Sequence, residues 1–290
     1  MCISNNIKKN ETAKYFILAC GGIENSRILL WTKEQNQNLI DNILPIGKYW
    51  MNHPWILSGS GAVNRRKLIN KLNNKFLDYD GLLHFATKKE LLKSKKILNA
   101  HMFMKYDEDL KIYKEVMRDI LCVAPKYGNK IVQMVLGKDL QCGNIYMQLE
   151  EPPNGNNKIV LDKEKDAYGI PKVKLFYKQS KDSLRTAKIV MDEFANLCRK
   201  DDIGRIAMKE NIYNLEGFES IGTYHHLGGT RIGINKFNSV VDKDLKVHNV
   251  NNLYVSGSSN FVTGGYSNPT FTIIQLALRL ADKLDKELNI

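Results

Sequence analysis

Two short segments carry side chains that could transfer protons or bind an anionic group. The first is YHHLGGTRIG, residues 224–233, in which two histidines precede a double glycine. An imidazole with a pKa near 6.5 exchanges protons at physiological pH, and glycines let a backbone approach a ligand closely. The second is GGYSNPTFT, residues 264–272, in which Asn268 is predicted to cap a helix that starts at Pro269. A buried helix N-terminus offers free N–H groups to a phosphate, a carboxylate or an electron-rich carbonyl.

Each segment also has a purely structural interpretation, a packed histidine pair in one case and a capped core helix in the other. Metal binding is not predicted, because adjacent histidines point apart and no acidic or cysteine ligand follows at ligand spacing. Five scattered cysteines without a CxxC pair exclude a disulfide scaffold and indicate a reducing, cytoplasmic compartment. The start shows no apolar signal region, and no apolar run predicts a membrane span.

The net charge of +12 comes mostly from lysines in residues 65–75 and 88–96. Asparagine and leucine are interleaved with these lysines, whereas a nucleic-acid surface would favour arginine and aromatic residues. We therefore predict a solvated basic surface over residues 65–96 and no nucleic-acid partner.

The elements that would position the two segments have an α/β pattern. KYFILAC, residues 14–20, predicts a buried strand, and GGIENSRILLW then predicts a helix that begins directly after a glycine turn. NLYVSG, residues 252–257, predicts a second strand that ends at glycine. The helix from Pro269 to about Glu287 is predicted to have a buried N-terminus, because its first two turns carry no charge; its apolar face would continue through Ile274, Leu278, Ala281, Leu284 and Leu288.

The middle of the chain has a different pattern. Residues 172–177 alternate in period two and predict a half-buried strand, and residues 144–149 and 158–161 predict strands joined across the turn-rich EEPPNGNN. Residues 183–200 predict a helix with an apolar stripe. Together they predict an antiparallel sheet covered by helices.

These segments, taken together, resemble the C-terminal part of the glucose–methanol–choline (GMC) oxidoreductase family. The resemblance is carried in order by HLGGTRIG, by SVVDKDLKVHNVNNLYVSGSSNF and by TGGYSNPTFTIIQLALRLAD, about residues 220–285. Upstream, ACGGIENSRILL, PIGKYWMNHPW and EEPPNGNNKIVL are similar to the family more loosely. The HLGGT form, with asparagine before Pro-Thr, is closest to the pyranose oxidase and sugar dehydrogenase branch.

The resemblance implies a fold that is α/β and α+β. A partial FAD-binding α/β domain of the glutathione-reductase-like type would be joined to an antiparallel-sheet substrate domain. The expected divisions are residues 1–51 for one FAD-domain segment, 52–215 for the substrate domain, and 216–290 for the C-terminal FAD-domain segment. The GxGxxG turn that holds the FAD diphosphate in the family is absent from this sequence. We therefore expect a separate or upstream N-terminal segment as a partner.

The resemblance also implies a reaction. An alcohol or sugar would be oxidised by hydride transfer to flavin N5 of FAD, with His226 as the base and Asn268 as a hydrogen-bond partner of the reacting oxygen. His225 is the competing base. The expected cofactor-binding residues are Cys20 and Gly21 on the adenosine side, Gly257 and Ser258 near the diphosphate or ribityl chain, and Asn268, Pro269 and Thr270 near flavin N1 and O2.

His53 and Trp55 are interpreted either as neighbours of the flavin ring or as packing residues. The alternative function is a non-catalytic remnant or accessory protein that keeps part of the fold and binds a partner.

Overall fold

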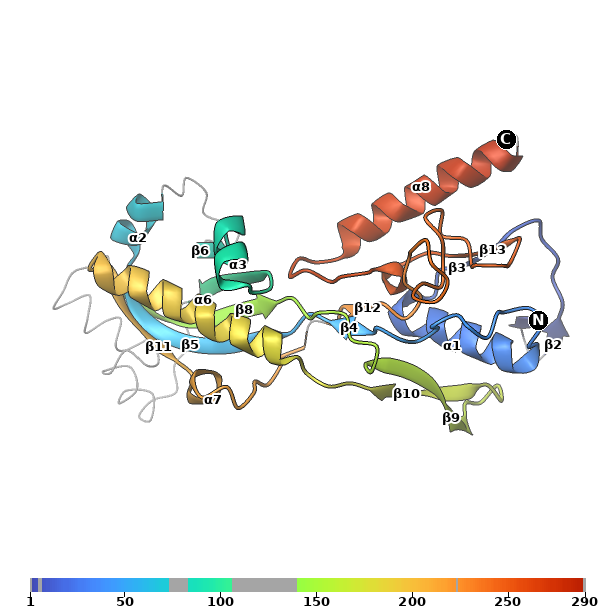
Figure 1. Cartoon of the computed structure of the whole chain (residues 1–290), viewed down its shortest axis with the longest axis horizontal. Helices are drawn as coiled ribbons and strands as arrows, with labels where there is room; N and C mark the ends of the chain where they lie inside the picture. The colour runs from blue at the N-terminus through green and yellow to red at the C-terminus, as the bar shows by residue number, and fades with distance from the viewer. Residues whose placement is uncertain (1, 5–6, 73–82, 106–139, 223, 289–290) are drawn as a thin grey trace.

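The computed structural model describes residues 2–4, 7–72, 83–105, 140–222 and 224–288. Its elements lie in two lobes, and the short strands β4 (Met51–Asn52) and β12 (His226–Leu227) pair with each other between the lobes (Figure 1). Each lobe has its own buried hydrophobic cluster. The site residues near β12 therefore lie where the two lobes meet.

The first lobe is built on an antiparallel sheet of five strands, in the order β11-β5-β8-β7-β6. The strands are β5 (Trp55–Asn64), β6 (Leu83–Ala86), β7 (Ala100–Lys105), β8 (Leu140–Leu149) and β11 (Gly204–Met208). The long helix α6 (Lys181–Lys200) covers one face of this sheet. The predicted antiparallel sheet with helices is confirmed.

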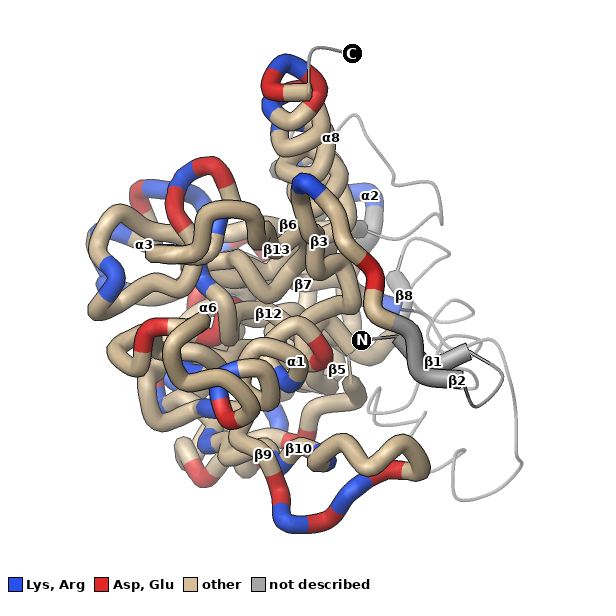
Figure 2. Tube along the Cα trace, turned by 90° about the vertical axis from the view of Figure 1, so that its right-hand side faces the viewer, with Lys and Arg blue, Asp and Glu red and all other residues tan. Residues whose placement is uncertain are grey.

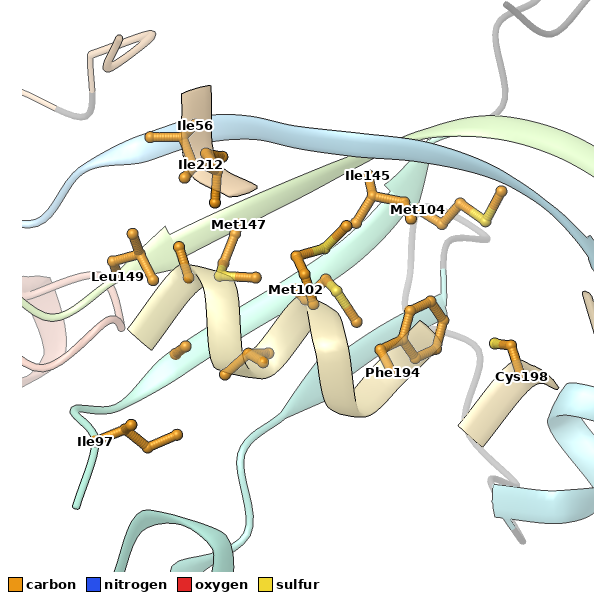
Figure 3. Packing of buried hydrophobic residues seen from close by; sticks show 14 of the residues in the cluster. Ile56, Ile97, Met102, Met104, Ile145, Met147, Leu149, Phe194, Cys198 and Ile212 are labelled. Carbon is orange, nitrogen blue, oxygen red and sulfur yellow. The ribbon is translucent and has the colours of Figure 1, made fainter. Parts of the chain in front are cut away.

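The core of this lobe lies between α6 and the sheet. Met102, Met147 and Phe194 are among the buried side chains that meet there (Figure 3). The predicted apolar stripe of α6 is confirmed, because the helix turns one face inward and buries Leu184, Ala187, Val190, Met191, Phe194 and Cys198. Alternate residues of β7 point into this core, and the intervening ones lie on the opposite face.

The second lobe holds the α/β part of the chain. Strand β3 (Phe16–Leu18) pairs in parallel with β13 (Leu253–Val255), and α1 (Gly21–Gln35) follows β3 directly. The hairpin of β9 (Lys158–Lys165) and β10 (Pro171–Phe176) lies against α1. The remaining elements are β1 (Cys2–Ser4), β2 (Ile7–Lys9), α2 (Arg65–Leu72), α3 (Lys89–Lys95), α7 (Glu210–Tyr213), the 3-10 turn η1 (Ser258–Asn260) and α8 (Thr270–Leu288).

Two predictions of burial in this lobe are wrong. Strand β3 is short and largely exposed, with Phe16 41% and Ile17 49% accessible, because β13 is its only paired neighbour among the described residues. The first turns of α8 are also exposed, with Phe271 74% and Leu278 55% accessible. The helix contacts its lobe chiefly through its second half, where Leu280 and Leu284 are buried. Apolar composition identified the elements but not what covers them.

Three predictions in the middle of the chain also need correction. Strand β10 is mostly exposed, since it belongs to a two-stranded sheet that packs on α1 from one side. Strands β8 and β9 lie in different sheets, so EEPPNGNN connects the lobes and does not close a hairpin. Within the basic stretch 65–96, residues 73–82 lie outside the described residues, and Leu68 is fully buried. No helix in the described ranges is both long enough and apolar enough to cross a membrane.

Candidate active site at the lobe junction

The backbone of His226 is fixed between three elements. It pairs with Asn52 of β4, and its carbonyl accepts a hydrogen bond of 2.7 Å from Ser258 Oγ at the start of η1. A Cβ on Gly22, in the first turn of α1, would overlap that carbonyl, so only glycine lets α1 approach so closely. The sequence prediction that His226 and Ser258 share a site is therefore consistent with their direct contact here.

The His226 ring is half-buried and stacks on the buried Trp50, with ring centroids 5.6 Å apart and planes 29° apart. Its Nδ1 is buried and has no hydrogen-bond partner among the described residues. Burial lowers the pKa of His226, which favours the neutral ring at neutral pH. A neutral imidazole with an unused ring nitrogen has the properties of a proton acceptor.

The neighbouring His225 meets a different partner. Its Nδ1 lies 2.5 Å from Nε2 of His53, and the two rings are nearly perpendicular. His53 is fully buried, and its pKa falls to about 4, first because of burial and then because of the charge of His225. The pKa of His225 is also lowered, by burial and by the charge of His226. The three histidines are thus electrostatically coupled and favour neutral rings.

The loop before α8 reaches both this histidine group and the sheet lobe. The backbone of Gly265 lies close enough to His53 to affect its pKa, and the Tyr266 ring stacks on His101 of β7 at 5.6 Å. Helix α8 begins at Thr270, one residue later than predicted, because its first hydrogen bond runs from the Ile273 N–H to the carbonyl of Pro269.

Of the three predicted flavin-contacting residues in this loop, Pro269 is buried. Asn268 and Thr270 are exposed, and the described part of the chain shows no hydrogen bond between Asn268 and His226. The structure therefore brings His226 to Ser258, and His53 to both His225 and Gly265, whereas Asn268 stands apart.

The predicted adenosine-side residues surround a buried asparagine that the sequence analysis missed. Cys20 is exposed, and its backbone N–H donates to Asn25 Oδ1 at 2.9 Å. Asn25 is fully buried and donates to the carbonyl of Ser256 and to Ser259 Oγ, which ties α1 to the chain around Gly257. A polar residue within an apolar helix face was the available signal. Within the described residues, no group of three or more acidic, cysteine or histidine side chains is placed to hold a metal ion.

A buried carboxyl group near His226 was also missed. Tyr177 packs on Trp50 at 5.5 Å and hydrogen-bonds to Glu151. Glu151 is 1% exposed and accepts hydrogen bonds from the Ser180 N–H and Ser183 Oγ. Burial raises the pKa of Glu151 to about 7, so near neutral pH this group changes charge beside the Trp50 stack.

The sheet face opposite α6 carries aromatic rings. Trp55 is tilted against Phe103 and Tyr146, with both centroid distances at 6.1 Å, so the structure places Trp55 in this cluster. A cavity of about 480 Å³ lies beside it, lined by Leu57, Lys209, Asn211, Phe218, Glu219, Ser220 and Ile221. No sequence motif predicted this surface, because its aromatic residues come from three separate strands, β5, β7 and β8.

Comparison with known proteins shows what this chain is similar to. Residues 153–277 match the family model described as GMC oxidoreductase. This stretch of the chain is similar to GMC oxidoreductases. The large subunit of fructose dehydrogenase from Gluconobacter japonicus is 25% identical over 96% of this chain and 48% of its own length. Paromamine 6'-oxidase from Streptomyces fradiae is 34% identical over 46% of this chain and 24% of its own length.

Solved structures show the same fold. The pyridoxine 4-oxidase of Mesorbium loti matches 93% of this chain and 51% of its own chain, with a TM-score of 0.57 and 11% identity. Formate oxidase of Aspergillus oryzae matches with a TM-score of 0.51 and 13% identity, over 94% of this chain and 54% of its own. The expected combination of α/β and antiparallel-sheet parts is confirmed. The chain spans about half the length of the fructose dehydrogenase large subunit and of these two solved structures.

Proposed function

We propose that this chain is part of an FAD-dependent enzyme that oxidises a CH–OH group of a sugar or another alcohol. The match of residues 153–277 to the GMC oxidoreductase family model supports this, as do relatives named for fructose, paromamine and a propanediol. The observation that carries the proposal is the half-buried His226, whose Nδ1 has no hydrogen-bond partner in the described part of the chain. A buried ring nitrogen without a hydrogen-bond partner, directly before LGGT, is available to accept a proton.

The residues present fit FAD. Gly21 has φ +94° and open space where a Cβ would stand, and Gly257 has φ +127° at the end of β13. At both positions a ligand could approach the backbone without meeting a side chain of that residue. We assign Cys20 and Gly21 to the adenosine side, and Gly257 and Ser258 to the diphosphate or ribityl chain. Asn268, Pro269 and Thr270 would lie near flavin N1 and O2. When bound, FAD would accept a hydride from the substrate carbon at N5.

His226 would take the hydroxyl proton as the alcohol is oxidised, because a carbonyl cannot form while that proton is retained. The lowered pKa keeps the ring able to accept it at neutral pH. The amide of Asn268 would hydrogen-bond the same oxygen but cannot act as a base. Because Asn268 is exposed here, this role requires the loop around it to be covered in the complete site.

We further propose that a polypeptide segment carrying the dinucleotide-binding turn covers β3 and α8, either in a longer protein or as a separate chain. Phe16 and Ile17 on β3, and Phe271, Ile274 and Leu278 on α8, are exposed apolar side chains. Figure 2 shows that the charged residues of α8 gather toward its C-terminal end. An exposed apolar helix beside an open strand favours a protein partner over solvent.

The test is to express this chain together with the coding sequence upstream of it, and to measure bound flavin and its anaerobic reduction by a panel of sugars and alcohols. We expect retained FAD and reduction by at least one sugar. His226→Ala should keep FAD but slow reduction about 100-fold or more, the usual loss for a general base. His248→Ala is the matched control, since the His248 ring hydrogen-bonds to Ser239 and not to a residue of the proposed site.

Failure to bind FAD in that preparation would remove the catalytic proposal and favour a non-catalytic accessory protein. Retained FAD with an unaffected His226→Ala variant would instead move the base to another residue, with His225 the first alternative.

A further inference from the structure

The side chain that faces the His226 ring is the indole of Trp50. The two ring planes are only 29° apart, and their centroids are separated by 5.6 Å. Nδ1 of His226 is buried and has no hydrogen-bond partner among the described residues. In a catalytic triad a carboxylate at that nitrogen orients the imidazole and stabilises its positive charge. In this chain the stacked indole is the group in place to do both.

Trp50 is itself firmly held. Its side chain is buried, and its backbone N–H donates to the carbonyl of Asn157 at 3.0 Å. Asn157 exchanges two hydrogen bonds with the backbone of Lys178, and the adjacent Tyr177 ring meets the indole edge to face at 5.5 Å. Because these contacts fix the indole, the imidazole of His226 that is stacked on it has little freedom to turn.

The indole face also affects the charge of the imidazole. It carries negative partial charge and attracts a cation whose centre lies within about 6 Å of the ring centroid, more strongly where water is excluded. The stack of His226 on the buried Trp50 meets both conditions. His226 becomes such a cation when it accepts a proton.

We infer that Trp50 is a positioning residue for His226, which fixes the plane of the imidazole and stabilises the imidazolium that forms when the ring takes a proton. The catalytic part of this inference rests on the proposed function, because it takes His226 as the base, whereas the stack itself needs neither flavin nor substrate. Burial lowers the pKa of His226 and so opposes proton uptake. The indole face acts in the opposite direction and keeps the buried ring basic enough to accept a proton.

The other titratable groups around His226 are mostly neutral. His225, next in the chain, contacts His53, whose pKa of about 4 leaves it uncharged at neutral pH. Burial raises the pKa of Tyr177, which is the titratable side chain packed on Trp50. Glu151 interacts with Tyr177 and has a pKa of about 7, so its charge changes in the range of interest. The experiment is therefore repeated in a Glu151→Gln background.

The experiment is a pH titration of the histidine rings by NMR in the isotope-labelled chain, with Trp50→Leu and Trp50→Phe as variants. We expect the pKa of His226 to fall by about 0.5 to 1 in Trp50→Leu, and by less in Trp50→Phe, because a phenyl face attracts a cation more weakly than an indole face. A packing role alone predicts the opposite sign, since a smaller side chain admits water and relieves the burial that lowers the pKa. Trp31→Phe, toward the C-terminal end of α1, is the matched control and should leave the pKa of His226 unchanged.

The sign of the change decides the inference. A pKa of His226 that rises or stays constant in the Trp50 variants would overturn it. If Trp50→Leu does not fold, Trp50→Phe and the wild-type spectrum decide, because ring protons of His226 that lie over the indole are shifted upfield by its ring current, and unshifted protons would show that the stack is absent.

These measurements need no flavin, so their failure is distinct from failure of the proposed function. In the preparation that binds FAD, a Trp50→Phe variant with a lowered His226 pKa should also reduce the flavin more slowly, by up to about 10-fold. Unchanged reduction in that variant would refute His226 as the base and leave the stacking assignment in place.

Discussion

Replacing Glu151 or His53 with glutamine should reveal two opposite pH dependences of folding stability that offset each other in the native chain. Glu151 has a folded pKa of about 7 against an ordinary value of 4.5, so the folded chain keeps a proton that the unfolded chain releases. Its stabilising contribution is complete below pH 4.5 and is lost as pH rises toward 7. His53 has a folded pKa of about 4 against 6.5, so its contribution is present above pH 6.5 and is lost as pH falls toward 4.

The size of each effect follows from the two pKa differences. One pKa unit corresponds to about 1.4 kcal/mol, and both groups titrate differently in the folded and unfolded chains across most of pH 4.5 to 6.5. Over these two units each contributes roughly 2–3 kcal/mol, with opposite signs. Both side chains are almost completely buried, so solvent screening does not reduce these values much.

The assay is urea unfolding at pH 4.5, 5.5 and 6.5, followed by tryptophan fluorescence. The stability of Glu151→Gln minus that of the wild type should rise by roughly 2–3 kcal/mol from pH 4.5 to 6.5, and the same difference for His53→Gln should fall by that amount. Glu164→Gln, at a solvent-exposed carboxylate paired with Lys172, should change little. If the difference in unfolding free energy between Glu151→Gln and the wild type does not change with pH, the Glu151 carboxyl group is not held protonated in the folded chain, and the reasoning is refuted.

Three further predictions concern the scaffold. Gly228→Ala should destabilise the chain by about 2 kcal/mol or more in urea unfolding, because φ is +75° and the new Cβ would overlap the carbonyl of Tyr49; unchanged stability would mean that this turn is not rigid. Arg27→Met should destabilise the β9–β10 hairpin locally, because Arg27 forms an ion pair with Asp166 at 2.6 Å. We expect faster hydrogen exchange of backbone amides in that hairpin and nowhere else. Leu278→Asp should reduce self-association of the chain, measured as the rise of apparent mass with concentration in light scattering. An apparent mass that rises as in the wild type would indicate that the exposed face of α8 does not mediate association.

Local periodicity determined how much of the fold could be predicted. The apolar stripe of α6 was predicted to be buried, and it is buried, because the described part of the chain itself supplies the core on which α6 packs. Strand β3 and the first turns of α8 have equally apolar sequences, yet they are exposed. An apolar pattern says that a surface is suited to burial, but it cannot say which polypeptide covers it.

The candidate site divides in the same way. His226 and Ser258 were predicted from two motifs and do meet, through the His226 carbonyl. The contact between His53 and His225, and the hydrogen bonds of the buried Asn25, join residues from distant parts of the chain. Such contacts leave no short-range pattern, so the structure was needed to find them.

The pairing of β4 with β12 also affects how the protein can diversify. The chain first leaves the α/β lobe after Asn52 and finally re-enters it at His226, and these two residues face each other. Between these points it returns once to the α/β lobe, as the β9–β10 hairpin that lies on α1. The five-stranded sheet and α6 are therefore attached both at the β4–β12 pair and at the two ends of this hairpin. A sheet lobe of different sequence would have to keep these connections, so evolutionary change is expected to concentrate in its outer strands while α1 and η1 keep their contacts with the His226 backbone.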